Sequence, residues 1–207
     1  MLPHCGILMI RLFTLLCKLN HIKLSDRQWF ERETEKMMLS DYACPVCGAK
    51  GCIEPFGHYG RYLVTWDGSA QVSHTVVVSR RRCSSCGHTH ALLPSCLVPY
   101  KSYSLRFILA VLRDYFLHIL PVEQLCQRYG ISISTLYRWL LLFKLQKSLW
   151  LGVIDDVALS AVSFLEELEG TFLRDFHQCF RISFLEGFHC TDKEPPPGRD
   201  VRQGGIT

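Results

Sequence analysis

Hydrophobic and polar positions alternate in the first half of the chain and recur at helical spacing in the second half. The two-residue period of a half-buried strand is clearest in residues 71–82, where one set of positions is Val72, His74, Val76 and Val78. A second β-rich run covers residues 53–64, and an Asp67-Gly68 step lies in the segment between the two runs. Because an Asp-Gly step between such runs is typical of a tight turn, this region predicts a β-hairpin.

Helical spacing predicts helices over residues 25–38, 104–118, 157–168 and 172–188. Ser25 is the expected N-cap of the first helix, with Gln28 in the capping-box position, and Ser104 is the expected N-cap of the second. Gly170 separates the last two helices. We expect their apolar faces to form core or a dimer surface, with phenylalanines that pack rather than bind a ligand: Phe164, Phe172, Phe176, Phe180 and Phe184.

Residues 121–140 predict two helices that meet at a sharp turn. Pro121 suits the first turn of the earlier helix, and Gly130 supplies the turn. Ser132 would cap the later helix. The positions expected to be buried are Leu125, Cys126, Tyr129, Ile131, Leu136, Trp139 and Leu140.

This pattern is typical of a helix-turn-helix, whose second helix enters the major groove of DNA. The polar positions left outside it give the expected DNA contacts, with two lysines farther along suited to phosphates: Ser132, Ser134, Thr135, Tyr137, Arg138, Lys144 and Lys147. The alternative is a helical hairpin that only packs.

Two Cys-x-x-Cys-Gly motifs, at residues 44–48 and 83–87, carry the strongest chemical signal. The spacing lets one tight turn aim two sulfurs at a point, and four thiolates suit a tetrahedral zinc ion. The predicted ligands of one structural Zn²⁺ are therefore Cys44, Cys47, Cys83 and Cys86. Chance occurrence and redox dithiols are the alternatives, but a thioredoxin-like motif would need no second pair.

Histidines and arginines lie close to these motifs. His58, His88 and His90 could each replace a cysteine, but four cysteines already fill a tetrahedral site. The run at residues 80–82 is three arginines. If it is a strand, its side chains alternate between faces, so at most two point the same way, toward phosphates or toward solvent.

Composition indicates a folded protein of 207 residues, with 48% hydrophobic and 20% charged residues. It contains eleven cysteines, yet no cleavable signal peptide is evident, so we expect a reducing cytoplasm with metal-bound thiolates. The other seven cysteines lack paired spacing, and we expect them to be reduced and unnecessary for the metal: Cys5, Cys17, Cys52, Cys96, Cys126, Cys179 and Cys190.

The net charge of +4 is unevenly distributed. Residues 80–147 contain ten Lys or Arg against two acids, whereas residues 150–190 contain two Arg against seven acids. A basic middle indicates a polyanionic partner, although such charges also simply solvate helices. The apolar run at residues 6–19 is interrupted by Arg11 and Lys18 and is too short to span a bilayer. It predicts a strand or helix packed on the fold, with a degenerate signal peptide or a mis-called start as alternatives.

These patterns predict an α+β fold, in which a small β-rich zinc ribbon is followed by an all-α helix-turn-helix domain. The expected segments are an N-terminal apolar segment and short helix at 1–40, the ribbon at 41–90, a linker at 91–103, the helix-turn-helix at 104–147, C-terminal helices at 148–190 and a disordered tail at 191–207.

With both motifs present, the chain resembles a family of uncharacterised bacterial proteins, often linked to transposons, that join an N-terminal zinc ribbon to a helix-turn-helix. The resemblance covers about residues 41–143 and rests on Cys-Pro-Val-Cys-Gly, on residues 80–94, on Val-Pro-Tyr-Lys-Ser-Tyr-Ser and on Gly-Ile-Ser-Ile-Ser-Thr-Leu-Tyr-Arg-Trp. The same order of modules is similar to the DNA-end-binding front of several insertion-sequence transposases. The resemblance implies zinc bound by the four cysteines, DNA met by residues 132–138, and no established reaction.

We expect no enzymatic activity, because an acidic-triad transposase needs a larger core of strands with carboxylate-bound metals. The acids of the C-terminal region fall on solvent-type helical positions: Asp155, Asp156, Glu166, Glu167 and Glu169. The first hypothesis is a DNA-binding regulatory or mobile-element factor in the cytoplasm, associated with the nucleoid. Double-stranded DNA is its partner, with a transposase or a second copy as further candidates and no membrane. The alternatives are a zinc-ribbon adaptor for protein or RNA, and a transposase remnant that acts with a separate catalytic subunit.

Overall fold

The computed structural model describes residues 8–12, 24–35, 42–153, 159–167, 170–180 and 182–187. The chain divides into two compact units, and the division falls between Phe107 and Ile108. The predicted tail at 191–207, most of the predicted N-terminal segment, and the acids Asp155, Asp156 and Glu169 lie outside the described residues.

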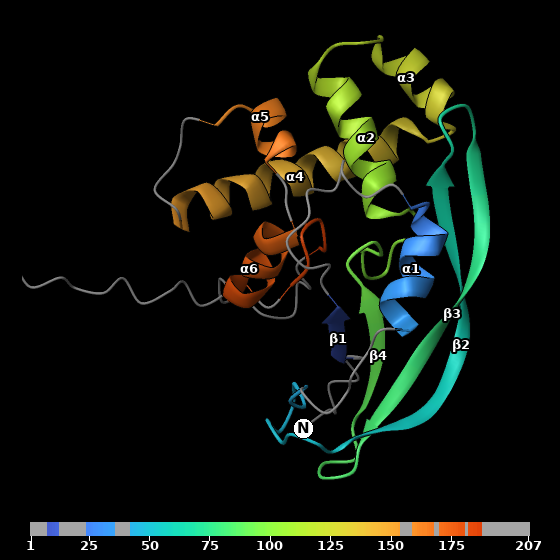
Figure 1. Cartoon of the computed structure of the whole chain (residues 1–207). Helices are drawn as coiled ribbons and strands as arrows, with labels where there is room; N and C mark the ends of the chain where they lie inside the picture. Colours follow the sequence, from blue (N-terminus) through green and yellow to red (C-terminus); the bar gives the residue numbers. More distant parts are fainter. Residues whose placement is uncertain are drawn as a thin grey trace, which may run out of the picture. The chain divides into compact units, whose positions relative to one another are not determined.

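The first unit is built on a sheet in the order β1-β4-β3-β2 (Figure 1). Its strands are β1 (Leu8–Leu12), β2 (Ile53–Trp66), β3 (Gln71–Cys83) and β4 (Thr89–Pro94). The pairs β2–β3 and β3–β4 are antiparallel, whereas β1 runs parallel to β4. The apolar N-terminal run thus contributes a strand, which is one of the two forms expected of it.

The predicted hairpin is confirmed by the pairing of β2 with β3. The side chain of Asp67 holds the turn, because its Oδ1 accepts hydrogen bonds from the backbone N–H groups of Ser69 and Ala70, both at 2.8 Å. These bonds, with the one from Ala70 first, lower the pKa of Asp67. Along β3, Val76 and Val78 are buried while Val77 between them is exposed, as the alternating pattern predicts.

β4 occupies a segment that the sequence predicts to be linker. Residues 91–103 contain two prolines and look irregular, yet Ala91, Leu92 and Leu93 form part of a strand and are each 1% exposed. The strand lies between β1 and β3: residues 90–94 pair with β1, and residues 89–91 pair with β3. Pro94 stands at the last position of the strand, where a missing N–H is tolerated.

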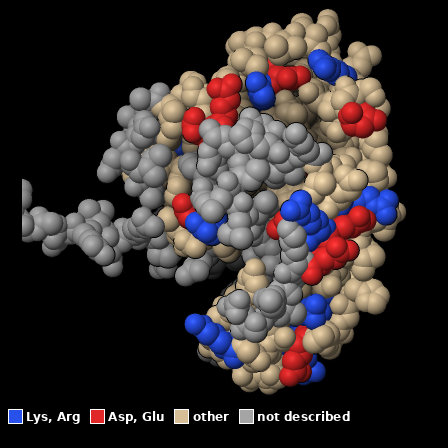
Figure 2. All heavy atoms as spheres, viewed as in Figure 1, with Lys and Arg blue, Asp and Glu red and all other residues tan. Residues whose placement is uncertain are grey.

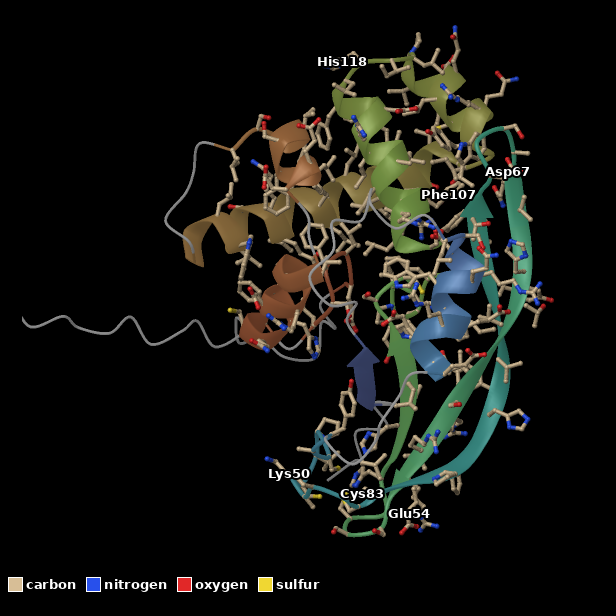
Figure 3. All side chains as sticks on the ribbon, in the orientation of Figure 1. Lys50, Glu54, Asp67, Cys83, Phe107 and His118 are labelled. Atoms are coloured by element: carbon tan, nitrogen blue, oxygen red, sulfur yellow. The ribbon has the colours of Figure 1, made fainter. Side chains whose placement is uncertain are left out.

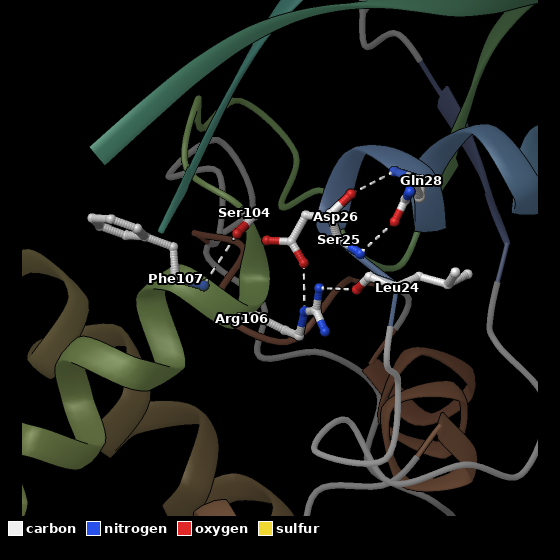
Figure 4. A network of polar contacts seen from close by, with 7 residues as sticks. All are labelled: Leu24, Ser25, Asp26, Gln28, Ser104, Arg106 and Phe107. Carbon is white, nitrogen blue, oxygen red and sulfur yellow. Dashed lines mark hydrogen bonds and ion pairs between the residues drawn. The ribbon is translucent and has the colours of Figure 1, made fainter. Parts of the chain in front are cut away.

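The helix α1 (Asp26–Glu35) begins with the expected capping box. Ser25 Oγ accepts from the Gln28 backbone N–H at 3.2 Å, and Gln28 Oε1 accepts from the Ser25 backbone N–H at 3.0 Å (Figure 4). Trp29 and Phe30 on this helix are buried, and the helix contacts β4. These contacts attach α1 to the first unit.

An ion pair links the start of α1 to the start of α2 (Leu105–Phe116). Arg106 Nε donates to Asp26, which is only 6% exposed, and the same guanidinium donates to the Leu24 carbonyl at 2.6 Å (Figure 4). Ser104 caps α2 as predicted, because its Oγ accepts from the Phe107 backbone N–H at 3.1 Å.

The second unit contains the rest of α2 and the helices α3 (Val122–Tyr129), α4 (Ile133–Val153), α5 (Ala161–Glu166) and α6 (Gly170–Phe180). Aromatic rings fill its core, with centroid distances of 4.7–5.8 Å among them. The rings include Phe116, Phe143, Phe164, Phe176, Phe180 and Phe184. The expectation that the C-terminal phenylalanines pack is therefore confirmed for Phe164, Phe176, Phe180 and Phe184.

The helix predicted for residues 172–188 is too long, because α6 begins at Gly170 and ends at Phe180. Residues 183–186 instead form a turn held by buried Gln146 of α4. Its Nε2 donates to the Glu186 carbonyl at 2.7 Å, and its Oε1 accepts from the Leu185 backbone N–H. A buried amide that satisfies backbone groups on a turn replaces the hydrogen bonds of a continued helix.

The class α+β is correct, but the predicted arrangement of a small ribbon followed by a separate all-α domain is wrong. The first unit has helix α1 before its long strands, takes a strand from residues 8–12, and includes the first turn of α2. The division between the units therefore falls inside α2, and not at residue 90, where the predicted ribbon ends.

Candidate functional site

The four predicted metal ligands lie on two turns with the same backbone hydrogen bonds. In each turn the glycine N–H donates to the carbonyl of the first cysteine, and the N–H of that cysteine donates to the carbonyl of the residue after the glycine. The four bonds are Gly48 to Cys44 at 2.8 Å, Cys44 to Ala49 at 2.8 Å, Gly87 to Cys83 at 2.8 Å and Cys83 to His88 at 2.9 Å. Both glycines have φ of 74°, the left-handed conformation that glycine adopts without steric cost.

The four sulfurs converge as a tetrahedral metal requires. Their Sγ atoms all lie within 4.8 Å of one another, with 3.7 Å between Cys44 and Cys86 and 3.7 Å between Cys47 and Cys83. A tetrahedron with metal–sulfur bonds of about 2.3 Å has edges of about 3.8 Å, so these distances fit a metal bound by four thiolates. The cluster can hold a metal ion.

The sheet brings the two turns together. Cys83 is the last residue of β3 and pairs with Ile53 at the start of β2, so the second turn lies at the end of the hairpin (Figure 3). Cys44 and Cys83 are 2% and 0% exposed, while Cys47 is exposed and Cys86 is intermediate. Each turn thus contributes one inner and one outer sulfur.

The thiols differ in their affinity for protons. Burial acts to raise the pKa of Cys83, but hydrogen bonds from the Cys86 backbone and from Cys52 outweigh it and lower this pKa to about 6. The His88 backbone acts to lower the pKa of Cys86, but burial and the neighbouring thiols raise it to about 12. The first thiolate forms easily, but its negative charge opposes deprotonation of the neighbouring thiols. A divalent cation at the centre of the cluster would offset this repulsion.

Two further side chains contact this cluster, and the sequence alone does not predict either contact. Cys52 Sγ is 3.3 Å from Cys83 Sγ, and His90 Nε2 is 3.4 Å from Cys44 Sγ. Cys52 precedes β2, and His90 lies on β4 opposite Arg81, so strand pairing places both residues. The sequence offers His90 as a possible ligand, but Cys52 has no partner at short spacing and so carries no signal that it belongs to the cluster.

Two of the three consecutive arginines share one face of the hairpin. The guanidinium groups of Arg80 and Arg82 lie 5.7 and 5.8 Å from the ring centroid of Phe56. Phe56 is 50% exposed and sits at a register shift between Pro55 and Gly57. The prediction that at most two arginines point the same way is confirmed.

The turn between α3 and α4 follows the predicted burial pattern. Gly130 ends α3 in the left-handed conformation, with φ of 63°, and Ser132 Oγ accepts from the Thr135 backbone N–H at 3.2 Å. Pro121 stands at the N-cap of α3, one place before the expected first turn. The residues predicted to be buried are all 7% exposed or less: Leu125, Cys126, Tyr129, Ile131, Leu136, Trp139 and Leu140.

The polar side chains at the start of α4 form one connected group, which is largely exposed. Ser132 Oγ lies 3.0 Å from Ser134 Oγ and 2.9 Å from Thr135 Oγ1. Arg138 donates to the Ser134 carbonyl and to Thr135 Oγ1, both at 3.2 Å. Four of the predicted DNA contacts are therefore adjacent on one face, which we call the α4 polar face: Ser132, Ser134, Thr135 and Arg138.

The three remaining candidate contacts differ in position. Tyr137 is 53% exposed and Lys144 is exposed, so both side chains are available to a partner. Lys147 is only partly exposed. It donates to the Leu159 carbonyl at 2.6 Å, and its ammonium lies 5.9 Å from the Phe164 ring centroid. Lys147 therefore holds the segment before α5 in this structure.

Charged side chains of both signs are interspersed on the face of the molecule that Figure 2 displays. In the part of the chain that the structure describes, no helix combines the length and apolar content needed to cross a bilayer.

Comparison with known proteins gives one result. A family model described as a domain of unknown function (DUF6431) matches residues 44–139, from the first cysteine of the cluster to the buried tryptophan of α4. No curated protein and no solved structure matches the chain. The matched residues include the thiol cluster, the hairpin and the α3–α4 turn.

Proposed function

We propose that the chain binds one structural zinc ion through Cys44, Cys47, Cys83 and Cys86. Zinc suits the site because four thiolates favour a soft, tetrahedral cation that needs no open coordination position. The 3.7 Å sulfur separations support this assignment. The ion would hold the two turns together at the end of the hairpin and add its binding free energy to folding.

Metal analysis of the purified chain tests this proposal. We expect one zinc per chain, and we expect Cys44→Ser to lose most of the metal and to lower the melting temperature. Cys96→Ser is the matched control, because Cys96 is equally buried but does not belong to the cluster. A metal-free native chain, or a Cys44→Ser variant with unchanged zinc, contradicts the proposal.

We further propose that the chain is a sequence-specific DNA-binding protein without catalytic activity, in which α3 and α4 form a helix-turn-helix. The α4 polar face is the observation that carries this proposal. It combines hydroxyl groups and a guanidinium, which hydrogen-bond to base edges, at the start of a helix whose opposite side is buried. Lys144, six residues after Arg138 on the same helix, adds an exposed cation for phosphate contact.

Selection from a random duplex library, followed by gel shifts, tests DNA binding. We expect a preferred sequence that is bound more tightly than scrambled duplex at every salt concentration, because base contacts add to phosphate attraction. Binding that shows no sequence preference, or none at all, contradicts this function. A preferred site at the end of a mobile element would favour a transposon-associated factor that acts with a transposase, and a site at a promoter would favour a transcriptional regulator.

A second candidate is an adaptor for RNA or protein, which the exposed hairpin supports. Tyr62 and Val77 are 68% and 57% exposed, and Phe56 stands beside two arginines. Aromatic and arginine side chains are typical of binding surfaces for single-stranded nucleic acid and for proteins. Binding to single-stranded RNA that exceeds duplex binding, and that Phe56→Ala weakens, would favour this candidate.

A further inference from the structure

The inner sulfur of each turn, Cys44 or Cys83, has a side-chain neighbour that lies outside the four-cysteine cluster. His90 Nε2 approaches Cys44, and Cys52 Sγ approaches Cys83. The outer sulfurs have only backbone partners outside the cluster, Ala49 for Cys47 and His88 for Cys86, whereas Cys83 has the Cys86 backbone in addition to Cys52. The cluster thus has two kinds of support, one from its own turns and one from the sheet.

These neighbours matter for a metal held by four thiolates, because the thiolates carry negative charge that hydrogen-bond donors stabilise. Four thiolates and one divalent cation carry a net charge of −2, and half of that set is buried at Cys44 and Cys83. Buried negative charge is stabilised by hydrogen-bond donors that point at the sulfurs. His90 is itself 0% exposed, and a thiolate has no proton, so its Nε2–H must be the donor in this contact.

The direction of the Cys52 hydrogen bond follows from the same argument. Its single S–H has two acceptors within reach, the Ala49 carbonyl at 3.1 Å and Cys83 Sγ at 3.3 Å. The Ala49 carbonyl already accepts from the Cys44 backbone N–H. Once metal binding makes Cys83 a thiolate, the charged sulfur is the stronger acceptor. Backbone geometry keeps Cys52 there, because Ser84 N–H donates to the Cys52 carbonyl at 2.9 Å.

We infer that His90 and Cys52 are positioning residues of the metal site, which donate hydrogen bonds to the Cys44 and Cys83 thiolates and do not bind the metal themselves. The inference rests on the proposed zinc centre. The sulfur of Cys52 touches Cys83 but falls outside the set of four that lie mutually within 4.8 Å, so the geometry separates donor from ligand. Removal of a partner of this kind typically weakens metal affinity about 10- to 100-fold.

Zinc affinity and the visible spectrum of the cobalt-substituted full chain test the inference. We expect Cys52→Ala and His90→Phe each to weaken zinc binding about 10- to 100-fold. Cys52→Ser and His90→Gln keep a donor at a similar position and should retain most of the affinity. The thiolate-to-cobalt absorption of every variant should keep the intensity of four thiolates, because no ligand is lost. Cys96→Ala controls for loss of a buried thiol in the same unit.

Different outcomes overturn different claims. If Cys52→Ala removes a quarter of the thiolate-to-cobalt absorption, Cys52 is a ligand and the inference is wrong. The inference also fails if the wild-type chain binds metal while Cys52→Ala and His90→Phe bind it as tightly as Cys96→Ala does. If the wild-type chain takes up neither zinc nor cobalt, the proposed metal centre fails together with the inference.

Discussion

The hydroxyl of Tyr129 donates a 2.8 Å hydrogen bond to Asp114 Oδ2, so the last turn of α3 is tied to α2. Tyr129 is 3% exposed and stands immediately before the glycine turn that precedes α4. The position of the α4 polar face depends on this turn, so the stability of the tyrosine contact bears on the proposed DNA-binding surface.

Alkaline pH should weaken this contact. Burial, with the hydrogen bond to Asp114, raises the pKa of Tyr129 to about 12 from the ordinary 10.0. The folded state thus favours the neutral phenol, and the stabilisation is complete below pH 10 and is lost as pH rises toward 12. Urea unfolding at several pH values should show this loss in the wild type and a smaller one in Tyr129→Phe. Equal pH dependence in the two proteins would contradict the assignment.

Breaking the ion pair between Arg106 and Asp26 should destabilise the first unit. Arg106→Leu leaves a carboxylate that is 6% exposed without its cation, and we expect a loss of about 3 kcal/mol in the free energy of unfolding. The double variant Asp26→Leu/Arg106→Leu should lose less, because no charge is left buried. A double variant that is less stable than Arg106→Leu would show that the pair is not the source of the effect.

The left-handed glycine in the first turn should be sensitive to substitution even though space is available. A Cβ on Gly48 would meet no atom within 4 Å, so the cost of Gly48→Ala comes from φ of 74° alone and should be about 1–2 kcal/mol. Gly60→Ala is the control, because Gly60 has no positive φ and its Cβ would make an ordinary contact with Thr75 at 3.6 Å. Chemical denaturation of the zinc-loaded proteins measures both, and equal losses would contradict the backbone explanation.

Mutation of Arg138 on the α4 polar face should reduce the ability of the chain to distinguish its preferred DNA sequence from others. Arg138→Ala should cost about 1–3 kcal/mol at the preferred site and relax one base position, with little change on scrambled duplex. Among its described contacts, Arg138 hydrogen-bonds only to Ser134 and Thr135 of its own helix, so removing it should spare the fold. Equal weakening on preferred and scrambled duplexes would mean that α4 does not read bases.

Lys144 gives the contrasting expectation. Its exposed ammonium suits a phosphate, so Lys144→Ala should weaken binding to all duplexes alike and reduce the slope of log affinity against log salt by about one. Lys147→Ala should instead lower stability, because Lys147 holds the Leu159 carbonyl. Gel shifts across a salt series, paired with thermal unfolding, separate the two roles. A specific loss at one base position for Lys144→Ala would contradict the phosphate assignment.

Features set by neighbouring residues could be predicted from the sequence. The N-caps Ser25, Ser104 and Ser132 and the left-handed Gly130 follow from rules that act within a few positions, and the structure confirms each of them. The paired Cys-x-x-Cys motifs likewise predicted which sulfurs converge.

Features set by long-range pairing could not be predicted in the same way. The segment of β4 resembles a linker because Pro94 and Pro99 mask a short buried strand, whose partners lie 82 residues away in β1 and nearby in β3. Cys52 and His90 approach the cluster only because Ile53 pairs with Cys83 and His90 with Arg81. The turn at 183–186 depends on Gln146, whose buried amide has no local signature.

The antiparallel register of the hairpin makes its length independent of the thiol cluster. Cys83 is fixed opposite Ile53 at one end of the hairpin, and Asp67 forms the turn at the other end (Figure 3). Adding two residues to each strand would keep every side chain on its own face and leave the sulfurs in place. An inserted peptide tag at Gly68 should therefore leave metal binding intact.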